Sequence, residues 1–214
     1  MNKKKLAIVH YSCPPIIGGV EFIVEAHARL FVEEGYNVRM IVGKGGNICP
    51  GVETILIPEI GSSGGPFGDE LLALSDGQLP PAFDVAVEQT KKRLMRALEG
   101  VDVCMMHNVL TMHFNLILAA ALAEIMKEHG ERTHFIGWSH DSTFRDVNYA
   151  KHQRNDYPWS LLSSKLEGCR YCVISEQRQA ELSKLFGVSP SCLPVIPDGV
   201  DVTSFYDLTP VIKG

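Results

Sequence analysis

The chain has 214 residues, of which 45% are hydrophobic and 21% charged, the composition of a globular protein long enough for one well-buried core. Its formal net charge of −5 argues against a general nucleic-acid binder, which needs a basic face. No apolar stretch reaches the roughly eighteen residues of a membrane-spanning helix, and the run after the amino-terminal lysines breaks at His10, too early for a signal peptide. We therefore expect a cytoplasmic protein without a nucleic-acid partner, and membrane association is not indicated.

A glycine turn between a strand and a helix is the most informative segment near the amino terminus. Residues 8–21 read IVHYSCPPIIGGVE, so that Gly18 and Gly19 precede an amphipathic stretch over residues 20–34. Glycine lets backbone N–H groups close around a ligand, and a helix amino terminus has about half a positive charge. The segment is typical of a phosphate contact, although a tight turn at the start of any α/β domain has the same pattern.

Apolar runs alternate with helical patterns along most of the chain. The spacing predicts helices over residues 20–34, 82–98, 113–129, 159–166 and 176–185. It predicts strands over residues 6–9, 37–42, 53–57, 101–106, 133–138, 171–174 and 193–196. Residues 58–81 are rich in Gly, Ser and Pro, and they predict a long irregular loop that is the least ordered interior segment.

This alternation predicts an α/β fold, namely a single Rossmann-like domain with a mostly parallel sheet of about seven strands. Binding residues in such sheets gather in loops at the carboxyl ends of the strands. Polar residues stand at four of the predicted strand ends: Tyr11 after the first, His107 and Asn108 after the fourth, His140 and Asp141 after the fifth, and Glu176 after the sixth. We expect these residues to share one edge of the sheet.

Several common motifs are missing from the sequence. The first turn lacks G-x-G-x-x-G and the second strand ends at Gly43 and Lys44 instead of an acidic residue, so the dinucleotide fingerprint fails, and with it a sugar-nucleotide epimerase. Neither a P-loop nor a G-x-S-x-G elbow is present. Cys169 and Cys172 have metal-ligand spacing, but no second CxxC or His pair completes the set, so we expect no metal.

Four motifs in chain order resemble glycosyltransferase family 4, whose members have the two-domain GT-B architecture. They are PPIIGGVE at 14–21, GWSHD at 137–141, YCVISEQRQAEL at 171–182 and VIPDGVD at 195–201. Residues 140–162 are also similar to the acceptor-side loop and helix of some members. The resemblance implies that residues 1–196 form the acceptor-side domain, that residues 197–214 begin the interdomain linker, and that the carboxyl-terminal nucleotide-sugar domain is absent from this chain.

The resemblance also implies roles for single residues. Gly18 and Gly19 are similar to the loop that approaches the donor diphosphate, where backbone amides stabilise charge on the leaving nucleotide. Glu21 would repel a close phosphate, so we expect its side chain to point away. His140 resembles the histidine beside the transferred sugar, and a neutral imidazole there can donate or accept a hydrogen bond with a sugar hydroxyl. Asp141 would orient the acceptor or act as a base, or else cap a short turn.

Acceptor or cleft contacts are implied for Tyr11, His107, Asn108 and Glu176. For the histidine at the end of the fourth strand, a hydrogen-bonded structural role is an open alternative. The segment around Glu176 is also the start of a predicted helix, with Ser175 as its N-cap.

The implied function is that of the amino-terminal half of a retaining glycosyltransferase, which transfers a sugar from a nucleotide-sugar donor to an acceptor hydroxyl without an obligatory metal or other cofactor. The family's acceptors are sugars, lipids and small metabolites. This chain alone is then expected to be inactive. The alternatives are a stand-alone sugar- or nucleotide-binding module, and a subunit that needs a separate donor-binding chain.

Overall fold

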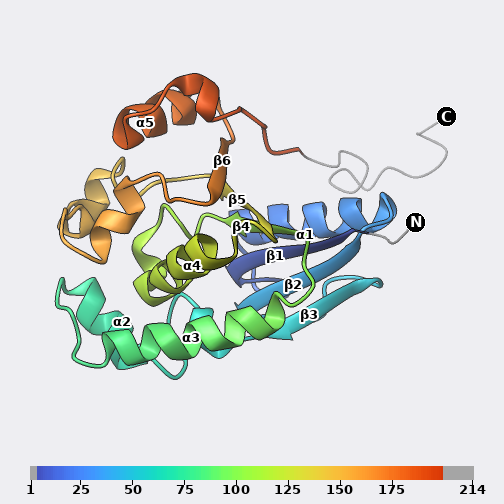
Figure 1. The fold of residues 1–214 in the computed structure, drawn as a ribbon, viewed down its shortest axis with the longest axis horizontal. Helices are drawn as coiled ribbons and strands as arrows, with labels where there is room; N and C mark the ends of the chain where they lie inside the picture. Colours follow the sequence, from blue (N-terminus) through green and yellow to red (C-terminus); the bar gives the residue numbers. More distant parts are fainter. Residues whose placement is uncertain (1–3, 200–214) are drawn as a thin grey trace.

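The computed structural model describes residues 4–199, and within them six parallel strands form one sheet in the order β3-β2-β1-β4-β5-β6 (Figure 1). The strands are β1 (Lys5–Ser12), β2 (Asn37–Lys44), β3 (Val52–Leu56), β4 (Val103–His107), β5 (His134–Ser139) and β6 (Cys169–Val173). β1 pairs with both β2 and β4, and the chain turns outward in opposite directions from this pair. β1 and β4 therefore form the switch point at which ligands of doubly wound sheets bind.

Helices cover both faces of the sheet (Figure 1). The α-helices of the described residues are α1 (Gly19–Glu33), α2 (Gly68–Ser75), α3 (Phe83–Ala97), α4 (Leu116–His129) and α5 (Glu176–Phe186). Successive side chains of β1 point to opposite faces of the sheet, as in any strand. Ile8 belongs to the hydrophobic cluster that includes residues of α1, and Val9 to the cluster that includes residues of α3 and α4. Among the helices of residues 4–199, none is long and apolar enough to cross a membrane.

The predicted seventh strand is wrong. Residues 193–196 make only one isolated bridge, between Val195 and Val173 of β6. Residue 194 is a proline, and because proline has no N–H group it cannot donate the next hydrogen bond of the ladder toward the start of β6. The sheet described by residues 4–199 thus has six strands. Of the expected linker over residues 197–214, residues 200–214 lie outside the described residues.

The predicted irregular loop over residues 58–81 is also partly wrong. It contains a 3-10 turn, η1 (Pro58–Ile60), and the two-turn helix α2. Phe67 and Leu74 are buried in the main core, so this segment is held against the domain by its apolar side chains. The flanking glycines obscured the helical spacing of Leu71 and Leu74.

The two cysteines with metal-ligand spacing lie in β6. Cys169 packs in the core on one face of the sheet and Cys172 in the core on the other, since their odd separation turns them to opposite faces. Burial raises the pKa of both thiols to about 12, which disfavours the thiolate that a metal requires. Within the described residues, no group of three or more His, Cys, Asp or Glu could hold a metal ion.

Candidate functional site

A pocket of about 360 Å³ lies at the carboxyl ends of β1 and β4, at the switch point of the sheet. β1, the start of α1 and the loops after β3 and β4 supply its walls: His10, Tyr11, Ser12, Gly19, Val20, Glu21, Ser62, Asn108 and Phe114. Imidazole, hydroxyl, carboxylate and amide groups thus line the pocket together with the rings of Tyr11 and Phe114. Convergent polar groups around a small cavity are the usual composition of a ligand site.

Glu21 points into this pocket, so the expectation that it points away is wrong. The hydroxyl of Ser12 donates to its Oε1 at 2.5 Å, and His10 Nε2 lies 3.6 Å from the same oxygen. The interaction with His10, together with the Ser12 hydroxyl, lowers the pKa of the Glu21 carboxyl to about 2 against the opposing effect of burial. An ionised carboxylate is therefore fixed at the pocket wall at neutral pH.

Gly18 and Gly19 play different parts in the turn. The backbone of Gly18 is extended, with φ of −167°, and a Cβ there would collide with the Glu21 carboxylate. Gly18 thus makes room for Glu21. A Cβ at Gly19, which lines the pocket, would meet nothing within 4 Å, so the open side of the α1 amino terminus lies at Gly19.

Asn108 fixes the loop that holds His140 and Asp141. Its φ of 62° is in the left-handed region, which asparagine tolerates better than most residues. Its Oδ1 accepts the backbone N–H groups of His140 at 3.2 Å and Asp141 at 2.9 Å. Thr111 Oγ1 donates to the Asp141 carbonyl at 2.6 Å, and Arg178 Nε to the His140 carbonyl at 3.1 Å. Three side chains, two from the loop after β4 and one from α5, therefore hold this loop.

The ring of His140 is 8% exposed, and both its nitrogens have protein partners. Nε2 lies 3.0 Å from Nδ1 of His107, and Nδ1 lies 3.0 Å from Oδ2 of Asp198. A sugar hydroxyl that bonds to this ring must replace one of these two partners. The histidine predicted from the resemblance is thus the centre of a three-residue chain of side chains.

The carboxylate of Asp141 is engaged within the protein. Its Oδ1 accepts the N–H of Ser142 at 2.8 Å and lies 3.2 Å from the guanidinium of Arg178. This bond goes to the directly following N–H, whereas a cap accepts from an N–H two or three residues on, so both the capping role and the action of Asp141 as a base stay predictions. Sequence reasoning missed Arg178 as a site residue. The sequence places Arg178 in the first turn of a predicted helix, where the helix dipole disfavours a cation. This position indicates that a carboxylate lies beside the guanidinium.

Comparison with known proteins identifies the fold. No protein-family model and no curated protein matches the sequence. Solved structures do match: WaaG, a glycosyltransferase involved in lipopolysaccharide biosynthesis (11% identity, TM-score 0.56, 96% of this chain and 48% of that one); a glycosyltransferase from Rickettsia africae ESF-5 (16%, 0.58, 99% and 48%); and the lipopolysaccharide outer core galactosyltransferase WaaB in its apo form (12%, 0.55, 92% and 46%). The fold is that of one GT-B domain. The chain spans about half the length of these solved chains.

Four histidines lie close together at the pocket of this GT-B domain, and one of them, His10, lines it. His107 is fully buried, and its pKa is well below the usual range because of burial and then because of neighbouring imidazoles, His140 first. His10 Nδ1 donates to the His107 carbonyl at 2.8 Å, and the ring of His27 lies 5.2 Å from that of His107. His10 and His27 were missed from the sequence. For His27 the signal is its position on the apolar stripe of α1, one turn after Val24.

The remaining predicted site residues divide into two groups. Tyr11 lines the pocket and its hydroxyl donates to the Met112 carbonyl at 3.4 Å, which makes it a wall of the site. Glu176 is exposed at the first position of α5 and is not among the pocket-lining residues, so the structure does not bring it to the others. Ser175 caps α5 through its bond from the Arg178 N–H at 3.2 Å, which confirms that prediction.

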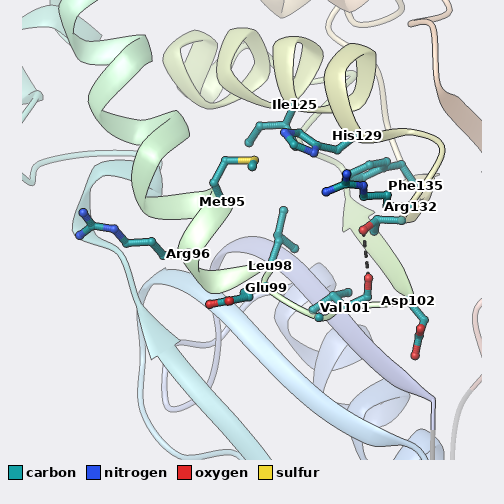
Figure 2. Close-up of a pocket in the computed structure, with 12 residues that line it drawn as sticks. Met95, Arg96, Leu98, Glu99, Val101, Asp102, Ile125, His129, Arg132 and Phe135 are labelled. Carbon is teal, nitrogen blue, oxygen red and sulfur yellow. Dashed lines mark hydrogen bonds between the residues drawn. The ribbon is translucent and has the colours of Figure 1, made fainter.

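A larger pocket of about 520 Å³ lies at the opposite edge of the GT-B domain, where β4 and β5 begin (Figure 2). Figure 2 shows Met95, Leu98 and Ile125 turned toward one another and Arg96 directed outward. The carboxyl-terminal ends of α3 and α4 meet here, and their negative dipole ends disfavour a phosphate. This hollow is therefore not the counterpart of the site at the switch point.

Proposed function

We propose that the chain is the acceptor-side half of a retaining glycosyltransferase, which transfers a sugar from a nucleotide-sugar donor to an acceptor hydroxyl once a second GT-B domain completes the cleft. The observation that carries this proposal is the polar pocket at the β1–β4 switch point, beside the loop of His140. The glycosyltransferase names of the structures that share the fold support the reaction class.

The pocket wall favours a neutral, polyhydroxylated acceptor. Glu21 offers ionised oxygens that accept hydrogen bonds from hydroxyl groups, and Ser62 and Asn108 add further polar contacts. Phe114 lines the same pocket and is 36% exposed, so its ring can pack against the apolar face of a sugar. We therefore infer a sugar or a related polyol as the acceptor.

In the proposed transfer, the residues at the different strand ends have separate roles. The bond between the anomeric carbon and the donor phosphate oxygen breaks, the acceptor oxygen bonds to the anomeric carbon on the same face, and the acceptor proton passes to the leaving phosphate. The backbone at Gly19, at the positive end of α1, faces the charge that grows on that phosphate. His140, held by Asn108, stands beside the transferred sugar, and Asp141 with Arg178 keeps its loop in place.

A transfer assay tests the proposal. The chain is joined to, or mixed with, a second GT-B domain that binds nucleotide sugars, and nucleotide release is followed with a panel of nucleotide sugars and of sugar and polyol acceptors. Acceptor-dependent release with a new glycosidic bond of retained configuration supports the function. Nucleotide-sugar or sugar binding without any transfer across the panel contradicts it and identifies a binding module instead.

A further inference from the structure

We infer that Asp198 is a positioning residue for His140: its carboxylate fixes the ring with the proton on Nδ1 and links the site histidine to the segment that pairs with β6. The inference concerns the site of the proposed function. Its prediction for kcat rests on that function, whereas its prediction for the His140 tautomer does not. It starts from three side chains that are distant in sequence, Asp198, His140 and His107, joined in one line by two contacts of 3.0 Å.

The segment that carries Asp198 is docked on β6. The Val173 N–H donates to the Pro194 carbonyl at 3.1 Å, and the Ile196 N–H donates back to the Val173 carbonyl at 2.8 Å. Gln179 of α5 adds a bond from its side-chain amide to the Leu193 carbonyl at 2.8 Å. The backbone therefore sets the position of Asp198, and the carboxylate reaches the ring of His140 from a fixed point.

The proton positions follow from what each group can do. An ionised carboxylate only accepts hydrogen bonds, so His140 must donate from Nδ1. The other nitrogen of a neutral ring is then an acceptor, and His107 must donate to it from Nδ1. This leaves Nε2 of His107 without a proton. That atom is buried without a partner among the described residues, and an unpaired acceptor is better tolerated there than an unpaired N–H.

The surroundings of Asp198 add a second, independent argument. The side chain is 23% exposed, and its Oδ1 is buried without a hydrogen-bond partner in the described part of the chain. A partly buried carboxylate is costly to desolvate unless it is hydrogen-bonded. The bond from His140 is the one that the structure gives it, so the two groups depend on each other.

Without Asp198, the order of donors can reverse. His140 could then donate from Nε2 to His107, whose own proton would move to the buried Nε2. Asp198→Ala removes the acceptor that prevents this exchange. Asp198→Asn removes the charge but keeps an oxygen that can accept from Nδ1, so it should preserve the proton position and rescue the arrangement.

Nitrogen-15 NMR of the imidazole rings in the 214-residue chain tests the inference without any substrate. In the unaltered chain we expect His140 to be the Nδ1–H tautomer. In Asp198→Ala we expect a mixture or the reverse tautomer, and in Asp198→Asn and in the exposed control Asp69→Ala we expect no change. An Nε2–H tautomer of His140 in the unaltered chain overturns the inference before any variant is made, as does an unchanged tautomer in a folded Asp198→Ala.

A second measurement uses the completed enzyme. Carboxylates that orient metal-ligating histidines change activity by about 10–100-fold. On that scale Asp198→Ala should lower kcat with little change in the KM for the acceptor, and Asp198→Asn should recover most of it. Equal kcat for Asp198→Ala and Asp69→Ala refutes the positioning role. If the completed enzyme shows no transfer at all, the proposed function fails, whereas the tautomer of His140 still decides whether Asp198 positions it.

Discussion

Replacement of Asn108 should loosen the loop of His140 and destabilise the whole domain. Asn108→Ala removes the oxygen that accepts the N–H groups of His140 and Asp141. The first of these donors belongs to a buried residue, and the second to a half-buried one. It also places an alanine at φ of 62°, which costs a residue with a Cβ roughly 1–2 kcal/mol.

The size of the effect follows from these two contributions. A buried donor left without a partner costs about 1–3 kcal/mol, and the half-exposed N–H of Asp141 costs less because water reaches it. Asparagine already bears part of the backbone strain, so with the remainder added we expect Asn108→Ala to lose about 2–4 kcal/mol in the free energy of unfolding. Asn108→Gly relieves the strain but not the lost hydrogen bonds, so it should lose roughly 1 kcal/mol less.

Urea unfolding of the 214-residue chain measures these differences at one pH. Asn148→Ala is the matched control, because Asn148 is exposed and a surface substitution should stay within about 0.5 kcal/mol. A loss below about 1 kcal/mol for Asn108→Ala would show that Arg178 and Thr111 hold the loop without Asn108. An alanine variant more stable than the glycine variant would refute the strain argument.

Three further predictions concern other parts of the domain. His113 stacks on His152 with ring centroids 3.8 Å apart, and burial, with the neighbouring His152, lowers the pKa of His113 from 6.5 to about 4. The unfolded chain therefore binds the proton more tightly than the folded chain. The free energy of unfolding should fall by about 1–2 kcal/mol as the pH drops from 6.5 to 4, after allowance for partial exposure. A His113→Gln variant with the same pH dependence, measured by urea unfolding, would contradict this. The amides of α2 (Gly68–Ser75), for example that of Leu71, which donates to the Phe67 carbonyl, should be protected from hydrogen exchange, whereas residues 62–65 should exchange fast. Uniformly fast exchange over residues 62–78 would contradict the packing of α2. Gly19→Val should impair turnover of the completed enzyme by blocking the approach of the donor phosphate. The matched control Gly68→Val, at the first residue of α2, should leave turnover unchanged. Equal turnover of the two variants would show that Gly19 does not belong to the donor site.

The sequence predicts most of this fold because its signals are local. Apolar runs and helical spacing place the strands β1 to β6 and the helices α1, α3, α4 and α5, and the rule for strand ends brings Tyr11, Asn108 and His140 to one edge. Ser175 is recognisable as a cap because it directly precedes a helical pattern. The presence of these strands and the positions of their ends can therefore be predicted from periodicity alone.

The parts that could not be predicted depend on contacts between distant residues. Asp198 meets His140 across 58 positions, and no spacing rule connects them. The inward turn of Glu21 depends on the Ser12 hydroxyl and on His10, which outweigh the simple expectation that an acidic side chain avoids a phosphate loop. The glycines around α2 hid a helix, whereas the apolar residues around Val195 suggested a strand that the structure does not form.

The most direct test of the proposed function compares His134, the first residue of β5, with His140, which directly follows its last residue. His140→Ala removes the imidazole at the carboxyl end of β5, and His134→Ala removes an exposed imidazole at its other end. In the transfer assay of the completed enzyme we expect His140→Ala to lower turnover on the order of 100-fold, the scale of one lost polar contact in a transition state, and His134→Ala to retain it. Near-equal turnover of the two variants, with both folded by thermal unfolding, would contradict the placement of the transfer site at this edge of the sheet.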